Sequence, residues 1–118
     1  MLASGIMDED AGSMMRILDS GAGAVVTKSI GLKPRKGHPN PTFVELEYGI
    51  LNAMGLPNPG ITEYVEELKV FEKKDDVIIG SIFGSTAEEF TQVATNMSPY
   101  VNAVELNLSC PHAEGYGL

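Results

Sequence analysis

The residues best suited to chemistry in this chain follow an apolar run that carries its only cysteine. Residues 104–108 read Val-Glu-Leu-Asn-Leu and predict a buried strand. Pro111 cannot continue a strand ladder and residues 113–118 are rich in glycine, so we expect Cys110 on a loop at the carboxyl end of that strand. Parallel α/β folds keep their catalytic groups at this end.

A loop thiol in that place is a candidate general base or nucleophile. The ordinary cysteine pKa of about 8.5 leaves a usable thiolate fraction near neutral pH, whereas a serine hydroxyl would have almost none. The alternative is a buried structural cysteine, which the residue type alone favours because cysteine is among the most buried residues. The neighbouring elements and motifs must therefore decide between the two interpretations.

Apolar runs and helical stripes alternate along the chain. We expect strands at 2–6, 22–27, 77–83 and 101–108, and helices at 9–20, at 61–71 and after a capping box formed by Ser85 and Glu88. Strands separated by helices predict an α/β fold with a parallel sheet and right-handed crossovers. Neither a doubly wound sheet nor half of a (β/α)₈ barrel is preferred at this level.

A proline-rich excursion interrupts this rhythm between residues 30 and 60. It contains two segments, 42–47 and 50–54, that predict a hairpin around Tyr48 and Gly49. Connections of this length are usually functional or disordered. The ordered motif that ends the excursion, at residues 52–58, favours a functional role.

Composition limits the function classes. The chain has 118 residues, 43% of them hydrophobic and 20% charged, which predicts one compact domain. A net charge of -8 with no basic face argues against binding to nucleic acid or to an anionic membrane. One unpaired cysteine suits a reducing cytoplasm, we expect a soluble, unprocessed chain, and the two histidines have no further ligands at metal-site spacing.

Three separated motifs carry a family resemblance. They are Thr27-Lys28-Ser29, residues 52–58 (Asn-Ala-Met-Gly-Leu-Pro-Asn) and residues 107–112 (Asn-Leu-Ser-Cys-Pro-His). In this order they resemble the N-terminal half of dihydroorotate dehydrogenase of class 1, a soluble FMN-dependent family whose archaeal and bacterial members use a cysteine base. The resemblance implies the N-terminal half of a TIM (β/α)₈ barrel. Residues 1–118 would form a partial FMN-binding domain with strands one to four, the C-terminal half being absent.

The resemblance also implies roles for particular residues. Cys110 would take a proton from C5 of dihydroorotate while a hydride leaves C6 for FMN, and Lys28 would stabilise the negative charge that develops. Positions that match flavin contacts are Ala3, Ser4, Gly5, Lys28, Ser29 and Asn107. Positions that match contacts to substrate are Lys28, Asn52, Met54, Gly55, Leu56, Asn107 and His112. The product would be orotate, an intermediate of de novo pyrimidine (UMP) biosynthesis.

One departure from the family pattern leaves the identity of the substrate undecided. His112 stands where many class 1 members have asparagine, and imidazole could also lower the pKa of the cysteine. The first alternative is therefore a flavin domain like that of dihydropyrimidine dehydrogenase, and the second is a non-enzymatic half-barrel that serves as an interaction module or remnant. The electron acceptor stays open between fumarate and NAD reached through an iron-sulfur partner subunit. We expect the isolated chain to be inactive and, because two sheet edges are free, to be a homo-oligomer.

Overall fold

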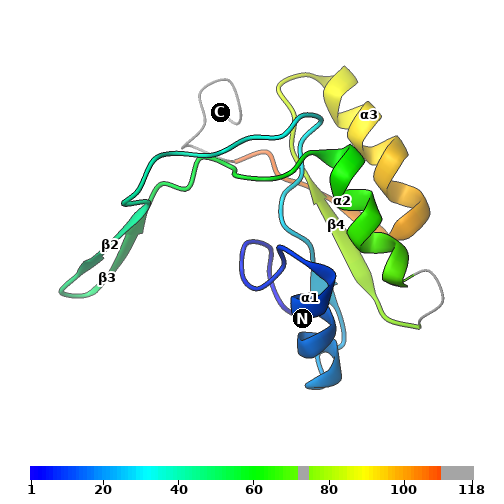
Figure 1. The fold of residues 1–118 in the computed structure, drawn as a ribbon, viewed down its shortest axis with the longest axis horizontal. Helices are drawn as coiled ribbons and strands as arrows, with labels where there is room; N and C mark the ends of the chain where they lie inside the picture. Colours follow the sequence, from blue (N-terminus) through cyan, green and yellow to red (C-terminus); the bar gives the residue numbers. More distant parts are fainter. Residues whose placement is uncertain (72–74, 110–118) are drawn as a thin grey trace.

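A three-stranded parallel sheet forms the centre of the molecule. The computed structural model describes residues 1–71 and 75–109. Its sheet has the order β1 (Val25–Val26), β4 (Ile78–Ile82) and β5 (Ala103–Leu106) (Figure 1). Leu2 extends the sheet beyond β1 through a single parallel bridge to Val25. The chain therefore adds its parallel segments side by side in sequence order, as successive strands of a (β/α)₈ barrel do.

The first two segments of the sheet are shorter than the sequence predicts. The expected strand at 2–6 is reduced to the bridge at Leu2, because the chain turns away at Gly5, whose φ of +89° suits glycine. Only Val25 and Val26 of the expected strand at 22–27 pair regularly. The ladder nevertheless continues beyond them, since Ile30 bridges to Ile82.

The helices begin and end close to the positions that the apolar stripes predict. They are α1 (Ala11–Asp19), α2 (Ile61–Leu68) with a 3₁₀ turn η1 (Lys69–Phe71), and α3 (Ala87–Met97) with a 3₁₀ turn η2 (Ser98–Tyr100). Asp10 caps α1, its Oδ1 accepting a hydrogen bond of 2.8 Å from the backbone N–H of Ser13. Along the part of the chain that the structure describes, none of these helices is long and apolar enough to cross a membrane.

The cap of α3 lies one residue later than predicted. Thr86, not Ser85, is the N-cap, and its Oγ1 accepts a hydrogen bond of 3.2 Å from Glu89 N. The Glu89 carboxylate accepts bonds of 2.8 Å from both the N–H and the hydroxyl of Ser85, which lower its pKa. The residues 85–89 contain two overlapping copies of the capping-box spacing, so the pattern alone could not choose between them.

The core lies between the sheet and the helices. Helices α2 and α3 run beside each other over β4 and β5, while α1 packs near β1 (Figure 1). The largest fully buried apolar side chains come from the three helices, β1, β4 and the segment after β1: Met14, Val25, Val26, Ile30, Tyr64, Leu68, Ile78, Ile82, Val93 and Met97. The helices cover one face of the sheet and leave the carboxyl ends of the strands uncovered, so a site can form there.

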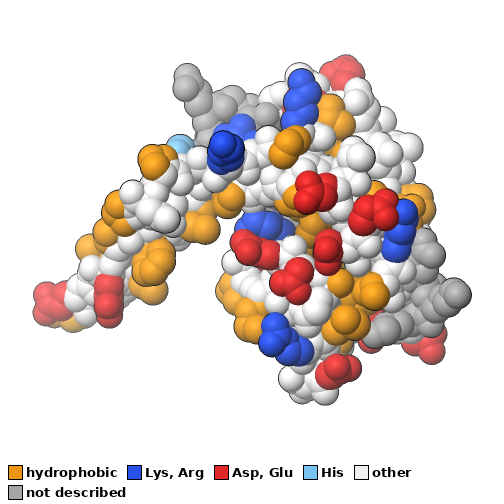
Figure 2. Space-filling view, viewed as in Figure 1, with side chains coloured by type: hydrophobic (Ala, Val, Ile, Leu, Met, Phe, Trp, Pro, Cys, Tyr) orange, Lys and Arg blue, Asp and Glu red, His pale blue; other side chains and the backbone are white. Residues whose placement is uncertain are grey.

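The predicted hairpin is present and extends away from the sheet. Strands β2 (Phe43–Leu46) and β3 (Gly49–Asn52) pair antiparallel, with Phe43 opposite Asn52. All eight residues are exposed, and apolar side chains gather along the arm in Figure 2. The segment that follows β3 returns to the sheet and brings Met54 and Leu56 to the ends of the parallel strands.

Candidate functional site

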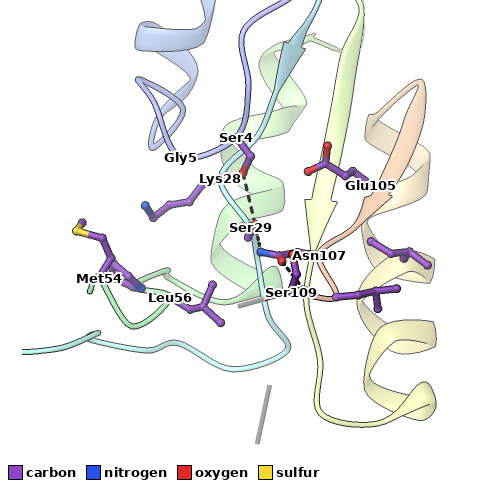
Figure 3. Close-up of a pocket in the computed structure, with 12 residues that line it drawn as sticks. Ser4, Gly5, Lys28, Ser29, Met54, Leu56, Glu105, Asn107 and Ser109 are labelled. Carbon is purple, nitrogen blue, oxygen red and sulfur yellow. Dashed lines mark hydrogen bonds between the residues drawn. The ribbon is translucent and has the colours of Figure 1, made fainter. Parts of the chain in front are cut away.

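A pocket of about 450 Å³ lies at the carboxyl ends of the parallel strands (Figure 3). Four segments that are far apart in the sequence build it: the turn after Leu2, the end of β1, the return from the hairpin and the end of β5. Its lining residues are Ser4, Gly5, Lys28, Ser29, Met54, Leu56, Pro57, Glu105, Leu106, Asn107, Leu108 and Ser109. The pocket therefore gathers residues from all three motifs of the sequence analysis.

Hydrogen bonds between side chains connect the strand ends along the pocket wall. Asn107 Nδ2 donates to Ser29 Oγ over 3.0 Å, and Ser29 Oγ lies 2.9 Å from Ser81 Oγ and 3.4 Å from Ser4 Oγ. Asn107 Oδ1 accepts a bond of 3.3 Å from Ser109 N. The hydroxyl of Ser29 thus contacts both Ser4 and Asn107 and connects the two segments that carry them.

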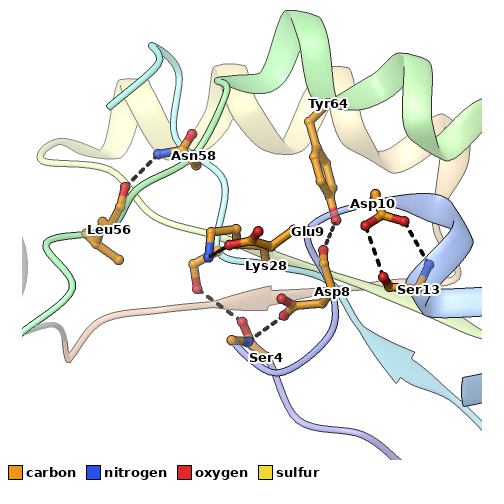
Figure 4. Close-up of polar contacts among 11 residues, drawn as sticks. Ser4, Asp8, Glu9, Asp10, Ser13, Lys28, Leu56, Asn58 and Tyr64 are labelled. Carbon is orange, nitrogen blue, oxygen red and sulfur yellow. Dashed lines mark hydrogen bonds and ion pairs between the residues drawn. The ribbon is translucent and has the colours of Figure 1, made fainter. Parts of the chain in front are cut away.

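Lys28 presents the positive charge of the site. Its side chain is only 13% exposed, and Nζ lies 3.3 Å from Oε1 of Glu9, which is 72% exposed (Figure 4). A pair with so exposed a carboxylate contributes little to stability. Lys28 also lines a second pocket of about 330 Å³. Since it borders both pockets, its ammonium can bind an anionic group of a ligand in either one.

The turn that carries Ser4 and Gly5 is closed by a buried carboxylate. Asp8 is fully buried; its Oδ2 accepts a hydrogen bond from Gly5 N, and its backbone oxygen accepts one of 2.7 Å from the Tyr64 hydroxyl. Among the described residues, Asp8 Oδ1 has no hydrogen-bond partner. Burial raises the pKa of Asp8, and the bond from Gly5 and the charge of Lys28 offset only part of that effect. Burial, with the nearby Asp8 charge, also raises the pKa of Tyr64.

Asp8→Asn is expected to stabilise the folded chain at pH 7 by about 1 kcal/mol, because it removes a buried charge and keeps an acceptor for Gly5 N. The pKa of Asp8 is higher in the folded chain than in the unfolded chain. The protonated carboxyl therefore contributes its full stability below about pH 3.8, and this contribution is lost as the pH rises through the folded-state pKa. The difference between the two proteins should therefore shrink on acidification. Urea unfolding of both at pH 7 and at pH 3.5 measures it; a variant that is less stable at pH 7 would contradict this account.

The segment between the hairpin and α2 is held by Asn58. Its Oδ1 accepts bonds from Gly31 N and Gly60 N, at 3.2 and 2.9 Å, and its Nδ2 donates to Leu56 O over 2.9 Å. Gly55 has a φ of +77°, which glycine adopts readily, but Leu56 has a φ of +55°, which a residue with a side chain adopts only when its surroundings impose it. Asn58 therefore builds the loop, as its Asn-Pro-Gly context predicts, and does not line the main pocket.

Seven of the predicted site residues line the pocket, namely Ser4, Gly5, Lys28, Ser29, Met54, Leu56 and Asn107. Three others do not: Ala3 is exposed beside it, Asn52 is exposed at the end of β3, and Gly55 is buried behind the loop, where its carbonyl accepts a 3.4 Å bond from Arg35 Nε. Cys110 and His112 lie outside the described residues, so their roles stay predictions.

Five lining residues were not predicted: Pro57, Glu105, Leu106, Leu108 and Ser109. For Glu105 a signal exists. It lies on β5 and precedes Asn107, the first residue past the strand, by two positions, and the two-residue alternation of extended chain places both side chains on one face. In the stretches 1–71 and 75–109, no group of three His, Cys, Asp or Glu side chains is arranged to hold a metal ion.

The fold and the site define a class: a portion of a parallel (β/α)₈ barrel with a ligand pocket at the carboxyl ends of its strands. Two solved structures of DHODH from Eimeria tenella share this fold. One, in complex with ferulenol, has a TM-score of 0.83 and 21% identity over 97% of this chain and 34% of its own. The ligand-free form has a TM-score of 0.84 and the same identity, over 98% and 36%.

The particular family follows from sequence. The family model of dihydroorotate dehydrogenase matches residues 1–117, and the chain belongs to this family. The catalytic subunit of dihydroorotate dehydrogenase B (NAD(+)) of Methanocaldococcus jannaschii is 58% identical over 98% of this chain. Its counterpart in Pyrococcus abyssi is 55% identical over the full chain. This chain spans 39% of the length of each of these relatives.

Proposed function

We propose that this chain is part of an FMN-dependent dihydroorotate dehydrogenase that oxidises dihydroorotate to orotate in pyrimidine biosynthesis. The observation that carries the proposal is the convergence of Ser4, Lys28, Ser29 and Asn107, from three separate segments, on one pocket. Membership of the family supports the same activity. Residues 1–118 would supply one part of the barrel and of the FMN site.

The donor set of the pocket fits one edge of a flavin. Such an edge alternates hydrogen-bond acceptors and donors, and hydroxyl and amide groups can meet both kinds. Ser4, Ser29 and Asn107 offer these groups on one wall, and Lys28 adds a positive charge beside them. Gly5 borders open space, because a Cβ built on it meets nothing within 4 Å, and its backbone is therefore accessible to a flat ring.

When bound, FMN would supply the acceptor for the hydride that leaves C6 of dihydroorotate. The thiolate of Cys110 would take the proton from C5, leaving a carbon-carbon double bond in the product orotate. Lys28 would lower the energy of negative charge as it develops on the reacting groups. Asn107 would orient the substrate ring, and Asn52 with the backbone of residues 54–56 would bind the substrate carboxylate.

The names of the relatives favour one electron acceptor. They are catalytic subunits of an NAD(+)-type enzyme. We therefore propose NAD as the acceptor, reached through an iron-sulfur partner subunit, in preference to fumarate. We also propose that the complete enzyme is cytoplasmic, and that its catalytic subunits form a homo-oligomer that binds the iron-sulfur subunit.

The test uses the complete gene product, purified without added flavin. A flavin absorption spectrum with stoichiometric FMN, bleached by dihydroorotate in the absence of oxygen, is the expected result. Bleaching by dihydrouracil and not by dihydroorotate would support the pyrimidine reductase alternative. A protein that neither carries nor binds FMN would overturn the proposal in favour of a non-enzymatic barrel portion.

A further inference from the structure

Ser81 is a fully buried serine of β4 that does not line the pocket, yet it touches the pocket wall. Its backbone N–H donates 3.0 Å to Thr27 Oγ1, and its backbone oxygen accepts a 3.0 Å bond from Ile30 N. Its side-chain oxygen lies 2.9 Å from Ser29 Oγ. Ser81 therefore lies behind Ser29, held by two hydrogen bonds of its backbone to the segment 27–30 that follows β1.

The direction of the hydrogen bonds around Ser29 follows from donor counting. Asn107 Oδ1 faces the N–H of Ser109, so the Nδ2 end of the amide must be the end that faces Ser29. Ser29 Oγ accordingly accepts a bond from Asn107. One lone pair of the Ser29 hydroxyl is thereby occupied.

The second lone pair of Ser29 faces Ser81, and the 2.9 Å contact between the two hydroxyls allows either oxygen to be the donor. A buried hydroxyl donates its proton wherever an acceptor is in reach. Within residues 1–71 and 75–109, Ser29 Oγ is the hydrogen-bond partner found for Ser81 Oγ. The arrangement that gives both hydroxyl protons an acceptor has Ser81 as the donor, because the proton of Ser29 can then turn toward the pocket. Both acceptor positions of Ser29 are then filled from the protein side.

The remaining group of Ser29 is its own O–H. Among the residues that the structure describes, the partner found on the pocket side is Ser4 Oγ at 3.4 Å, which is long for a bond between hydroxyls, whose usual length is about 2.7–2.8 Å. A ligand acceptor that enters the pocket can take this proton with better geometry. Ser29 is thus presented to the pocket as a donor only.

We propose that Ser81 is a positioning residue that fixes Ser29 as a hydrogen-bond donor, so that the ligand atom beside Ser29 is an acceptor, such as a carbonyl oxygen or an unprotonated ring nitrogen. This inference rests on the proposed flavin site and deepens it. A ligand with an N–H or NH₂ group at that point is disfavoured, because two donors would face each other.

The test is a double-mutant cycle in the complete gene product. FMN dissociation constants are measured by flavin fluorescence for the wild type, Ser81→Ala, Ser29→Ala and the double variant. Each single change should weaken binding about threefold to tenfold, the usual range for one neutral hydrogen bond. The double variant should match Ser29→Ala, since Ser81 acts through Ser29. Ser81→Thr, which keeps the hydroxyl, should restore affinity, and Ser13→Ala, in the first turn of α1 and outside the pocket lining, is the matched control.

Two outcomes would overturn the inference: FMN affinity unchanged in Ser81→Ala, or a loss in the double variant equal to the product of the two single losses. A second readout works without flavin. In protein labelled with ¹⁵N at asparagine, the Asn107 side-chain amide signal should shift in Ser81→Ala and stay in place in Ser13→Ala; an unmoved signal would also overturn it. If the wild type binds no FMN, the proposed function fails, and the amide signal alone decides whether Ser81 orders Ser29.

Discussion

Cys110→Ala in the complete gene product is expected to slow flavin reduction by dihydroorotate by about 10²-fold to 10⁴-fold, the usual range for loss of a general base. The proton at C5 would have no acceptor, while the proposed flavin contacts at Ser4, Lys28 and Ser29, which line the pocket, would be untouched. FMN should therefore stay bound. Anaerobic stopped-flow spectroscopy of the FMN absorbance measures the rate directly.

Cys110→Ser is the matched control for this prediction. It keeps the size of the side chain but replaces a thiol of pKa about 8.5 with a hydroxyl that does not ionise near neutral pH. Partial activity that rises toward high pH is expected. Reduction of flavin at the wild-type rate in the alanine variant would show that another group takes the proton.

Much of the architecture could be predicted because it depends on local patterns. Each of the three helical stripes, and the turn at Tyr48 and Gly49, is encoded by residues that are close together in the sequence. The helices and the turn accordingly lie close to their expected positions. The strands are less well predicted at their ends. Pairing at Leu2 stops after one bridge because Asp8 draws Gly5 into a turn, a contact that periodicity does not contain.

The site shows the same division. Lys28 and Ser29 follow the expected strand at 22–27, and Asn107 lies near the end of the expected strand at 101–108. The family motifs implied their roles, and the rule that parallel sheets build sites at their carboxyl ends agrees with their place in the pocket. Ser81 could not be found in this way, because its importance depends on the register that brings it to 2.9 Å from Ser29, 52 positions earlier in the chain. Asn52 was assigned by motif alone, and its exposure on β3 leaves its role as a prediction.

Lys28→Ala is expected to lower the rate of flavin reduction by about 10²-fold to 10³-fold, the usual effect of removing one group that stabilises developing negative charge. The Lys28 side chain is 13% exposed and borders both pockets, so little water can replace its charge. Stopped-flow reduction by dihydroorotate measures the loss. Lys33→Ala is the control of equal charge, since Lys33 is exposed and does not line the main pocket.

Lys28→Arg should not rescue the rate, although it preserves the charge. Arginine carries its charge on a planar fork, whereas lysine places a compact ammonium at the end of a flexible stem. The space beside Lys28 is shared with Ser29, Leu56 and Pro57 on one side and with Glu9 on the other, so the larger group would be displaced toward Glu9. Glu9→Gln separates the two effects, because it removes the ion pair and leaves the ammonium in place. Full activity in Lys28→Arg would show that charge alone is required and that the compact ammonium does not contact the reacting groups.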